Sequence, residues 1–180
     1  MSIIRSLRPN LSREQALARL RPAGFLGRWL CRGPLRSVAE VYIPFRLYQV
    51  EIKNAGKCDL RLLALDSVQG TLDLYGFDHV PEAHEFIEVE TRNQPQPDVD
   101  AHRACELVVE KVHRLLFLTG FFRIRDLAVV VKPLHFEFHV PYWVGFFGSG
   151  EHAQLAVLDA VRCSREGAKV RSLLQDWLTH

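Results

Sequence analysis

Apolar residues recur along the chain with two periods, and each period predicts one kind of element. A spacing of three and four residues predicts amphipathic helices. Their apolar stripes are Ala101, Ala104, Cys105, Val108, Val112 and Leu115 in the middle of the chain, and Val170, Leu173, Leu174, Trp177 and Leu178 near its end. Another helix is predicted between Ser12 and Pro22, because Ser12-Arg13-Glu14-Gln15 is a capping box. Segments rich in valine, isoleucine and aromatic residues predict β-strands after the helix between Ser12 and Pro22 and after the helix in the middle of the chain.

One order of features occurs twice. The segment VYIPFRLYQV (41–50) aligns with FHVPYWVGFF (138–147), so that two Pro-aromatic pairs coincide. Downstream, LLALDSV (62–68) aligns with LAVLDAV (155–161), and a helical segment precedes each copy. Because proline cannot donate to a sheet ladder, each shared proline predicts a bulge or an edge. The chain therefore contains two related halves.

The first copy ends in a predicted turn, in which Asp66 caps backbone amides and Gly70 adopts a positive φ before a strand resumes. We predict an α+β fold made of two pseudo-repeats of a helix followed by antiparallel strands, plus a C-terminal amphipathic helix. The predicted halves are 1–91, with a basic N-terminal arm, and 98–180. The polar, proline-rich segment RNQPQP (92–97) is the predicted linker, within one compact molecule.

The first half resembles a PepSY-type module over about residues 11–75. Three short motifs carry the resemblance: a Ser-x-x-x-Ala helix start (12–16), a Tyr-x-Val strand (48–50) and an aspartate-to-glycine hairpin (66–70), with glutamine in place of the usual threonine. The second half departs from the pattern, since Cys163 stands where the hairpin glycine is expected. The resemblance implies binding or inhibition of another protein rather than catalysis.

The composition fits an ordinary soluble globular chain, with 48% hydrophobic and 24% charged residues in 180. The N-terminal segment lacks the apolar core of a secretory signal, and no apolar run is long enough to span a bilayer. Four scattered cysteines form no CxxC pair, so we expect reduced thiols. These features predict a cytoplasmic protein without a transmembrane segment.

The small net charge of +2 hides two charged regions. Residues 1–36 carry eight arginines against one acid, a net of +7, and residues 72–110 carry ten acids against two arginines, a net of −8. Arg28 and Arg32 lie where arginines alternate with bulky apolar residues, which suits an acidic partner, nucleic acid or an anionic membrane surface. The alternatives are mutual docking of the two regions, solvated faces, or an ordinary strand at Arg28 and Arg32.

The segment HFEFH places His135, Glu137 and His139 on one side of a predicted strand. Three such ligands with an open position would suit a zinc site, and the alternative is the polar face of a sheet. In the alignment of the halves Glu137 coincides with Glu40, but neither histidine has a histidine counterpart. A twofold metal site is excluded, a one-sided site stays open, and the two glutamates are predicted to pair with arginines or to face a common groove.

The remaining candidates are Tyr142 and Trp143, in an aromatic-rich strand where alternation would bury only every second side chain. We predict a non-enzymatic protein-binding or regulatory accessory subunit, whose partner is another protein or a second copy of the chain. The alternative is a small-ligand or lipid-binding protein with a cavity between helix and sheet. A metal-dependent hydrolase using zinc at His135, Glu137 and His139 is the least favoured hypothesis.

Overall fold

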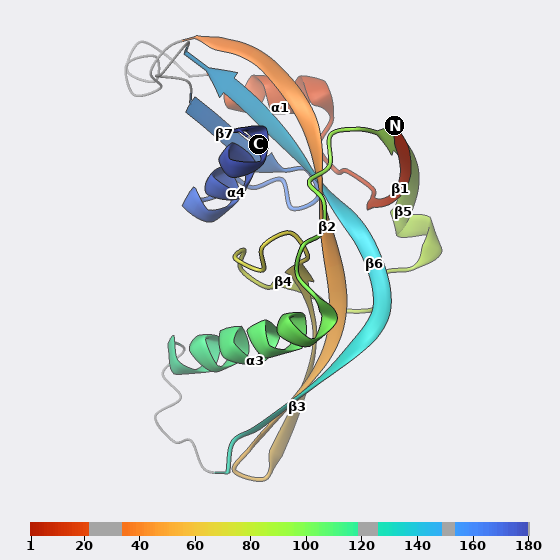
Figure 1. Ribbon diagram of the computed structural model, residues 1–180, viewed down its shortest axis with the longest axis vertical. Helices are drawn as coiled ribbons and strands as arrows, with labels where there is room; N and C mark the ends of the chain where they lie inside the picture. The colour runs from red at the N-terminus through yellow and green to blue at the C-terminus, as the bar shows by residue number, and fades with distance from the viewer. Residues whose placement is uncertain (22–33, 119–125, 149–153, 180) are drawn as a thin grey trace. The chain divides into compact units, whose positions relative to one another are not determined.

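A computed structural model describes residues 1–21, 34–118, 126–148 and 154–179 (Figure 1). Within these ranges the chain is α+β, as predicted, and its elements follow in this order: β1 (Ser2–Leu7), α1 (Arg13–Leu20), β2 (Leu35–Asn54), β3 (Lys57–Asp66), β4 (Tyr75–Phe77), the 3₁₀ turn η1 (Ala83–Glu85), β5 (Phe86–Thr91), α3 (Ala101–Leu118), β6 (Ala128–Phe147), β7 (Gln154–Asp159) and α4 (Ala168–Thr179). Among the described helices, none has both the length and the hydrophobicity that crossing a membrane requires.

The strands form one mixed sheet in the order β4-β3-β2-β6-β1-β5, with β7 also paired to β6. The pairs β2–β3, β3–β4, β1–β5 and β6–β7 are antiparallel, whereas β1 meets β6 in parallel at Ser6 and His139. The register between β2 and β3 is fixed by a tight two-residue turn, in which Ala55 and Gly56 both have positive φ angles.

The chain folds into two compact units whose segments alternate in sequence. Unit 1 contains 1–43, 85–95 and 139–180, and unit 2 contains 44–84 and 96–138. This division differs from the predicted halves, because β2 and β6 each contribute residues to both units. Only the boundary after Pro95 falls inside the predicted linker.

In unit 2, α3 packs its apolar stripe on the sheet. Ala104, Val108, Val112 and Leu116 of the helix are buried against Tyr48, Val50 and Ile52 of β2 and Leu63 and Leu65 of β3. The predicted stripe is confirmed at Ala104, Val108 and Val112 and half-buried at Cys105. At its two ends it is wrong, since Ala101 and Leu115 are exposed and Leu116 takes the last buried place. A spacing of four residues from one buried position to the next keeps the stripe on one side of this helix.

In unit 1, α1 begins with the predicted capping box. The Ser12 hydroxyl accepts from the Gln15 amide, while the Gln15 side chain accepts from the Ser12 amide. The helix buries Ala16 and Leu20 against a cluster that includes Trp143 and Leu158. The C-terminal helix α4 buries Val170, Leu173 and Leu174 of its predicted stripe and lies against β7, but Trp177 is half-buried and Leu178 is exposed.

The ends of β3 and β7 share a local arrangement. Asp66 is fully buried and accepts from the amides of Gln69, Gly70 and Leu72, and Gly70 has a φ of +67°. Asp159 accepts in the same way from the next amides along its turn, and Cys163 stands four residues later with a φ of +57°. The aspartate turn is therefore confirmed, although the next strand starts at Tyr75 rather than directly after Gly70.

Two successive helix-then-strand repeats are not shown by the structure. The helices that precede the long strands differ, with 8 residues in α1 and 18 in α3, and β3 has 10 residues where β7 has 6. The halves share the long strands and the aspartate turns, and the rest of each half is built differently.

Candidate functional site

Unit 2 contains a recess of about 200 Å³ beside the first turn of α3. It lies between this turn and the neighbouring strands β2 and β6. Its lining residues are Arg46, Leu47, Tyr48, Ala101, Pro133, His135, Phe136 and Glu137. Alternate residues of a strand face the same side, so Arg46 with Tyr48, and Pro133 with His135 and Glu137, project toward the start of the helix. The recess thus stands between helix and sheet, the place where the sequence allowed a ligand cavity.

Arg46 is held in the recess by two contacts. Its Nε donates to the Glu137 carboxylate at 2.5 Å, and its Nη1 donates to the carbonyl oxygen of Val99 at 2.8 Å. The arginine side chain is 25% exposed and the glutamate side chain 65% exposed. Two fixed bonds orient the planar guanidinium group, and within the described part of the chain they leave its Nη2 without a partner.

Tyr48 supplies a hydroxyl to the same wall. Its side chain packs in the core under α3 and only 1% of the residue is exposed. Burial raises the pKa of Tyr48 to about 12, with smaller contributions from Cys105, Arg46 and Glu137. The hydroxyl is therefore protonated at ordinary pH, and it has no hydrogen-bond partner among the described residues. The hydroxyl is therefore open to a hydrogen bond with water or with a ligand.

The backbone at His135 is unusual. This residue has a φ of +48°, in the left-handed region, and its side chain is exposed at the rim of the recess. Histidine adopts this region more readily than most residues, but such positions still store strain and tend to cluster at binding sites. The turn of the backbone here lies two residues before Glu137, the partner of Arg46.

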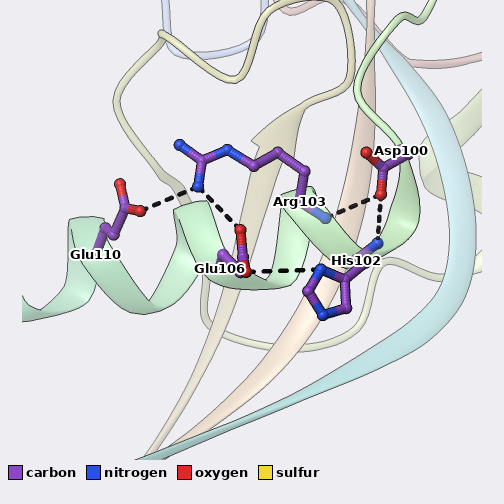
Figure 2. Close-up of polar contacts among 5 residues, drawn as sticks. All are labelled: Asp100, His102, Arg103, Glu106 and Glu110. Carbon is purple, nitrogen blue, oxygen red and sulfur yellow. Dashed lines mark hydrogen bonds and ion pairs between the residues drawn. The ribbon is translucent and has the colours of Figure 1, made fainter.

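The first turn of α3 is already capped by its own chain. Figure 2 shows the backbone nitrogens of His102 and Arg103 directed at the Asp100 carboxylate, and these two bonds are the main causes that lower the pKa of Asp100. Arg103 also contacts Glu106 and Glu110 on the exposed side of the helix. Because Asp100 occupies the amides of His102 and Arg103, these two groups are not open to an anion in the recess.

The three residues of the predicted metal site lie in different surroundings. His135 and Glu137 line the recess of unit 2, but Glu137 is bonded to Arg46. His139 belongs to unit 1, where its Nδ1 lies 3.3 Å from the carbonyl oxygen of Arg5. Across residues 1–21, 34–118, 126–148 and 154–179, no three His, Cys, Asp or Glu side chains are grouped as metal ligands. The zinc hypothesis therefore gains no support and stays a prediction.

The predicted binding residues Tyr142 and Trp143 are core residues of unit 1, which corrects their assignment to a partner surface. They are 2% and 7% exposed, and the Trp143 Nε1 donates to the carbonyl oxygen of Leu11 at 2.8 Å. Residues 140–145 are all buried, so both faces of β6 are covered here. The expectation that only alternate side chains would be buried is wrong for this stretch.

The aligned glutamates have different partners. Glu137 does pair with an arginine, whereas half-buried Glu40 in unit 1 accepts from the hydroxyl of Tyr42. Burial raises the pKa of Glu40, and this hydrogen bond acts in the opposite direction. Arg28 and Arg32, the remaining binding candidates, lie outside the described residues.

Arg46 and Tyr48 are the recess residues that the sequence prediction missed. A signal was present, because Arg46 is the one charged residue within the strand segment IPFRLYQV (43–50), and a charge in such a segment needs a partner. Nothing in the sequence marked the hydroxyl of Tyr48, since a tyrosine at this period reads as core.

Comparisons with known proteins found no matching family model, no matching curated protein and no matching solved structure.

Proposed function

We propose that this chain is a binding protein that holds a small molecule in the recess beside the first turn of α3. The observation that carries the proposal is the pairing of two donors in this recess: the guanidinium of Arg46, which two bonds hold in place, and Tyr48, whose hydroxyl has no hydrogen-bond partner among the described residues. A ligand that presents acceptor atoms can bond to both donors.

The composition of the walls supports binding. Pro133 and Ala101 provide apolar surface, and Arg46 and Tyr48 provide a small number of oriented polar groups. Ligand sites are commonly built in this way. The volume of about 200 Å³ lies below the roughly 300–1,000 Å³ of sites for drug-sized molecules, so the ligand is smaller.

The chemistry of the polar groups favours binding over catalysis. A general base works best when its pKa is near the operating pH, and the pKa of Tyr48 is raised to about 12. The guanidinium of Arg46 stays charged and cannot exchange protons at ordinary pH. A regulatory or accessory role, as the sequence predicts, is compatible with such a binder, and binding of another protein with the PepSY resemblance stays a prediction.

Filling the recess tests the proposal. Ala101 lines the recess from the first turn of α3, so Ala101→Trp places an indole ring there, and Arg114→Trp adds the same ring at an exposed position near the end of the helix. Native mass spectrometry and ligand-observed NMR with a library of small fragments would measure binding. We expect the wild type and Arg114→Trp to bind the same fragments and Ala101→Trp to lose them. A wild type that binds none, or Ala101→Trp binding unchanged, would refute the proposal.

A further inference from the structure

Two hydrogen-bond donors without partners line the same recess. Arg46 has five N–H groups, and its Nε and Nη1 are engaged by Glu137 and the Val99 carbonyl. Its Nη2 has no partner within the described ranges, and neither has the hydroxyl of Tyr48. A ligand suited to this wall must therefore present acceptor atoms.

The two donors act in one electrostatic neighbourhood. Arg46 and Tyr48 both line the recess, and so does Glu137, the partner of Arg46. Tyr48 and Arg46 stand two residues apart on β2, so their side chains leave the same face of the strand. One acceptor group of a ligand can thus meet both donors.

Charge decides which acceptor group fits best. A cationic ligand would meet the guanidinium of Arg46, which is fixed in place by its two bonds. Glu137 offsets this positive charge only partly, because its carboxylate is largely exposed and screened by water, whereas the arginine is mostly covered. Bonds between a guanidinium and a carboxylate are roughly twice as strong as bonds between neutral groups. An anionic oxygen pair therefore gains more at this wall than an amide or an alcohol.

The rest of the recess fixes how such a ligand lies. The amides of His102 and Arg103 at the start of α3 are occupied by Asp100, whose negative charge repels an anion from the helix end. The carboxylate is therefore directed to β2, and the apolar surface of Pro133 and Ala101 remains for the body of the ligand.

From these contacts, and resting on the proposed binding function, we infer that the ligand is a small carboxylic acid in its ionised form. Its carboxylate bonds to Nη2 of Arg46 and to the hydroxyl of Tyr48, and its short apolar or aromatic body packs against Pro133 and Ala101.

Matched probes and matched variants test the inference. The probes are benzoate, benzamide and benzyl alcohol, with butyrate, butyramide and butanol as an aliphatic set. The variants are Tyr48→Phe, which removes one oxygen atom, and Arg46→Lys, which keeps the charge but removes the planar fork. Tyr75→Phe and Arg61→Lys are their controls, since both residues belong to unit 2 but neither lines the recess. Titrations followed by ligand-observed NMR give the dissociation constants.

We expect the carboxylates to bind more tightly than their neutral analogues, and each recess variant to weaken this binding about tenfold or more. The two control variants should leave it unchanged. Tyr48→Phe should fold as well as the wild type, because the lost hydroxyl has no partner in the described structure, so this variant decides the matter even if Arg46→Lys proves unstable.

The outcomes separate the inference from the function on which it rests. If neutral analogues bind as tightly as carboxylates and Ala101→Trp abolishes both, the recess is a binding site and the carboxylate inference is overturned. If carboxylates bind but Tyr48→Phe leaves their affinity unchanged, the inference is also overturned. If no probe and no library fragment binds the folded wild type, the proposed function and the inference fail together.

Discussion

Replacement of Gly70 by alanine tests whether the Asp66 turn is held against α3. The φ of Gly70 is +67°, and a Cβ atom there would lie 2.4 Å from Cδ1 of Leu107 on the helix. Gly56, at the tip of the β2–β3 hairpin, provides the matched control. Its φ is +77°, but a Cβ at that position would have no atom within 4 Å. The two substitutions share the backbone strain and differ in the clash.

The magnitudes follow from this difference. Alanine in the left-handed region costs about 1 kcal/mol at either position. Forcing an extra methyl group into a packed contact adds about 1–3 kcal/mol. We therefore expect Gly56→Ala to lower the free energy of unfolding by about 1 kcal/mol and Gly70→Ala to lower it by about 2–4 kcal/mol. Urea unfolding with an unchanged m-value measures both losses.

A double variant identifies the clashing atom. If Leu107 causes the additional loss, Gly70→Ala combined with Leu107→Ala should be more stable than the sum of the single changes predicts, because the shorter side chain makes room for the methyl group. Equal losses for Gly70→Ala and Gly56→Ala would refute the reasoning, since they would show that the turn does not press on the helix.

Three further predictions concern charged groups. Asp100→Ala should lower the urea midpoint at pH 7 more than Asp98→Ala, because only Asp100 accepts from the amides of His102 and Arg103. The difference should shrink as the pH falls below 3.8, where Asp100 of the unfolded chain takes up a proton, and should be lost once the pH has passed the lowered pKa of the folded state. Glu40→Gln should raise the free energy of unfolding at pH 7 but not at pH 4. Because the pKa of Glu40 is raised in the folded state, the wild type loses stability as the pH rises above 4.5, and the glutamine variant does not. Equal effects of the substitution at both pH values would contradict this sign. Glu137→Gln should lower the free energy of unfolding by less than about 1 kcal/mol, since the glutamate side chain of the ion pair with Arg46 is largely exposed. Urea unfolding in low and high salt would measure this loss, and a larger one would show that the pair acts as a buried ion pair.

Local features of the fold could be predicted from the sequence because the atoms that make them are close in the chain. The capping box at Ser12 needs four residues, and the Asp66 turn needs seven. The apolar stripe of α4 is visible within nine residues, and the structure buries its Val170, Leu173 and Leu174. Even the departure at Cys163 was informative, because this cysteine adopts the positive φ that a glycine would have.

The division into units could not be predicted from local features. β2 and β6 each contain 20 residues, and a straight strand of that length spans about 65 Å, far beyond the usual 3–10 residues. One small core cannot cover such a strand, so different parts of β2 and β6 belong to different units, and the boundaries fall at Pro44 and His139 instead of at a flexible linker alone. Covering of both faces also explains why Tyr142 and Trp143 are buried together.

The candidate site was predicted in part, and the missing part depends on distant contacts. The alignment selected Glu137 and predicted an arginine partner for it. Only the fold, in which β2 and β6 are adjacent strands, shows that this partner is Arg46. For Tyr48 the decisive property is what its hydroxyl lacks, and that property is set by α3, which begins more than fifty residues later. A sequence pattern places a tyrosine in a core, whereas the demand for a ligand arises only where the first turn of a helix leaves its hydroxyl facing open space. The tests at Tyr48 and Ala101 therefore probe a feature that belongs to the folded unit.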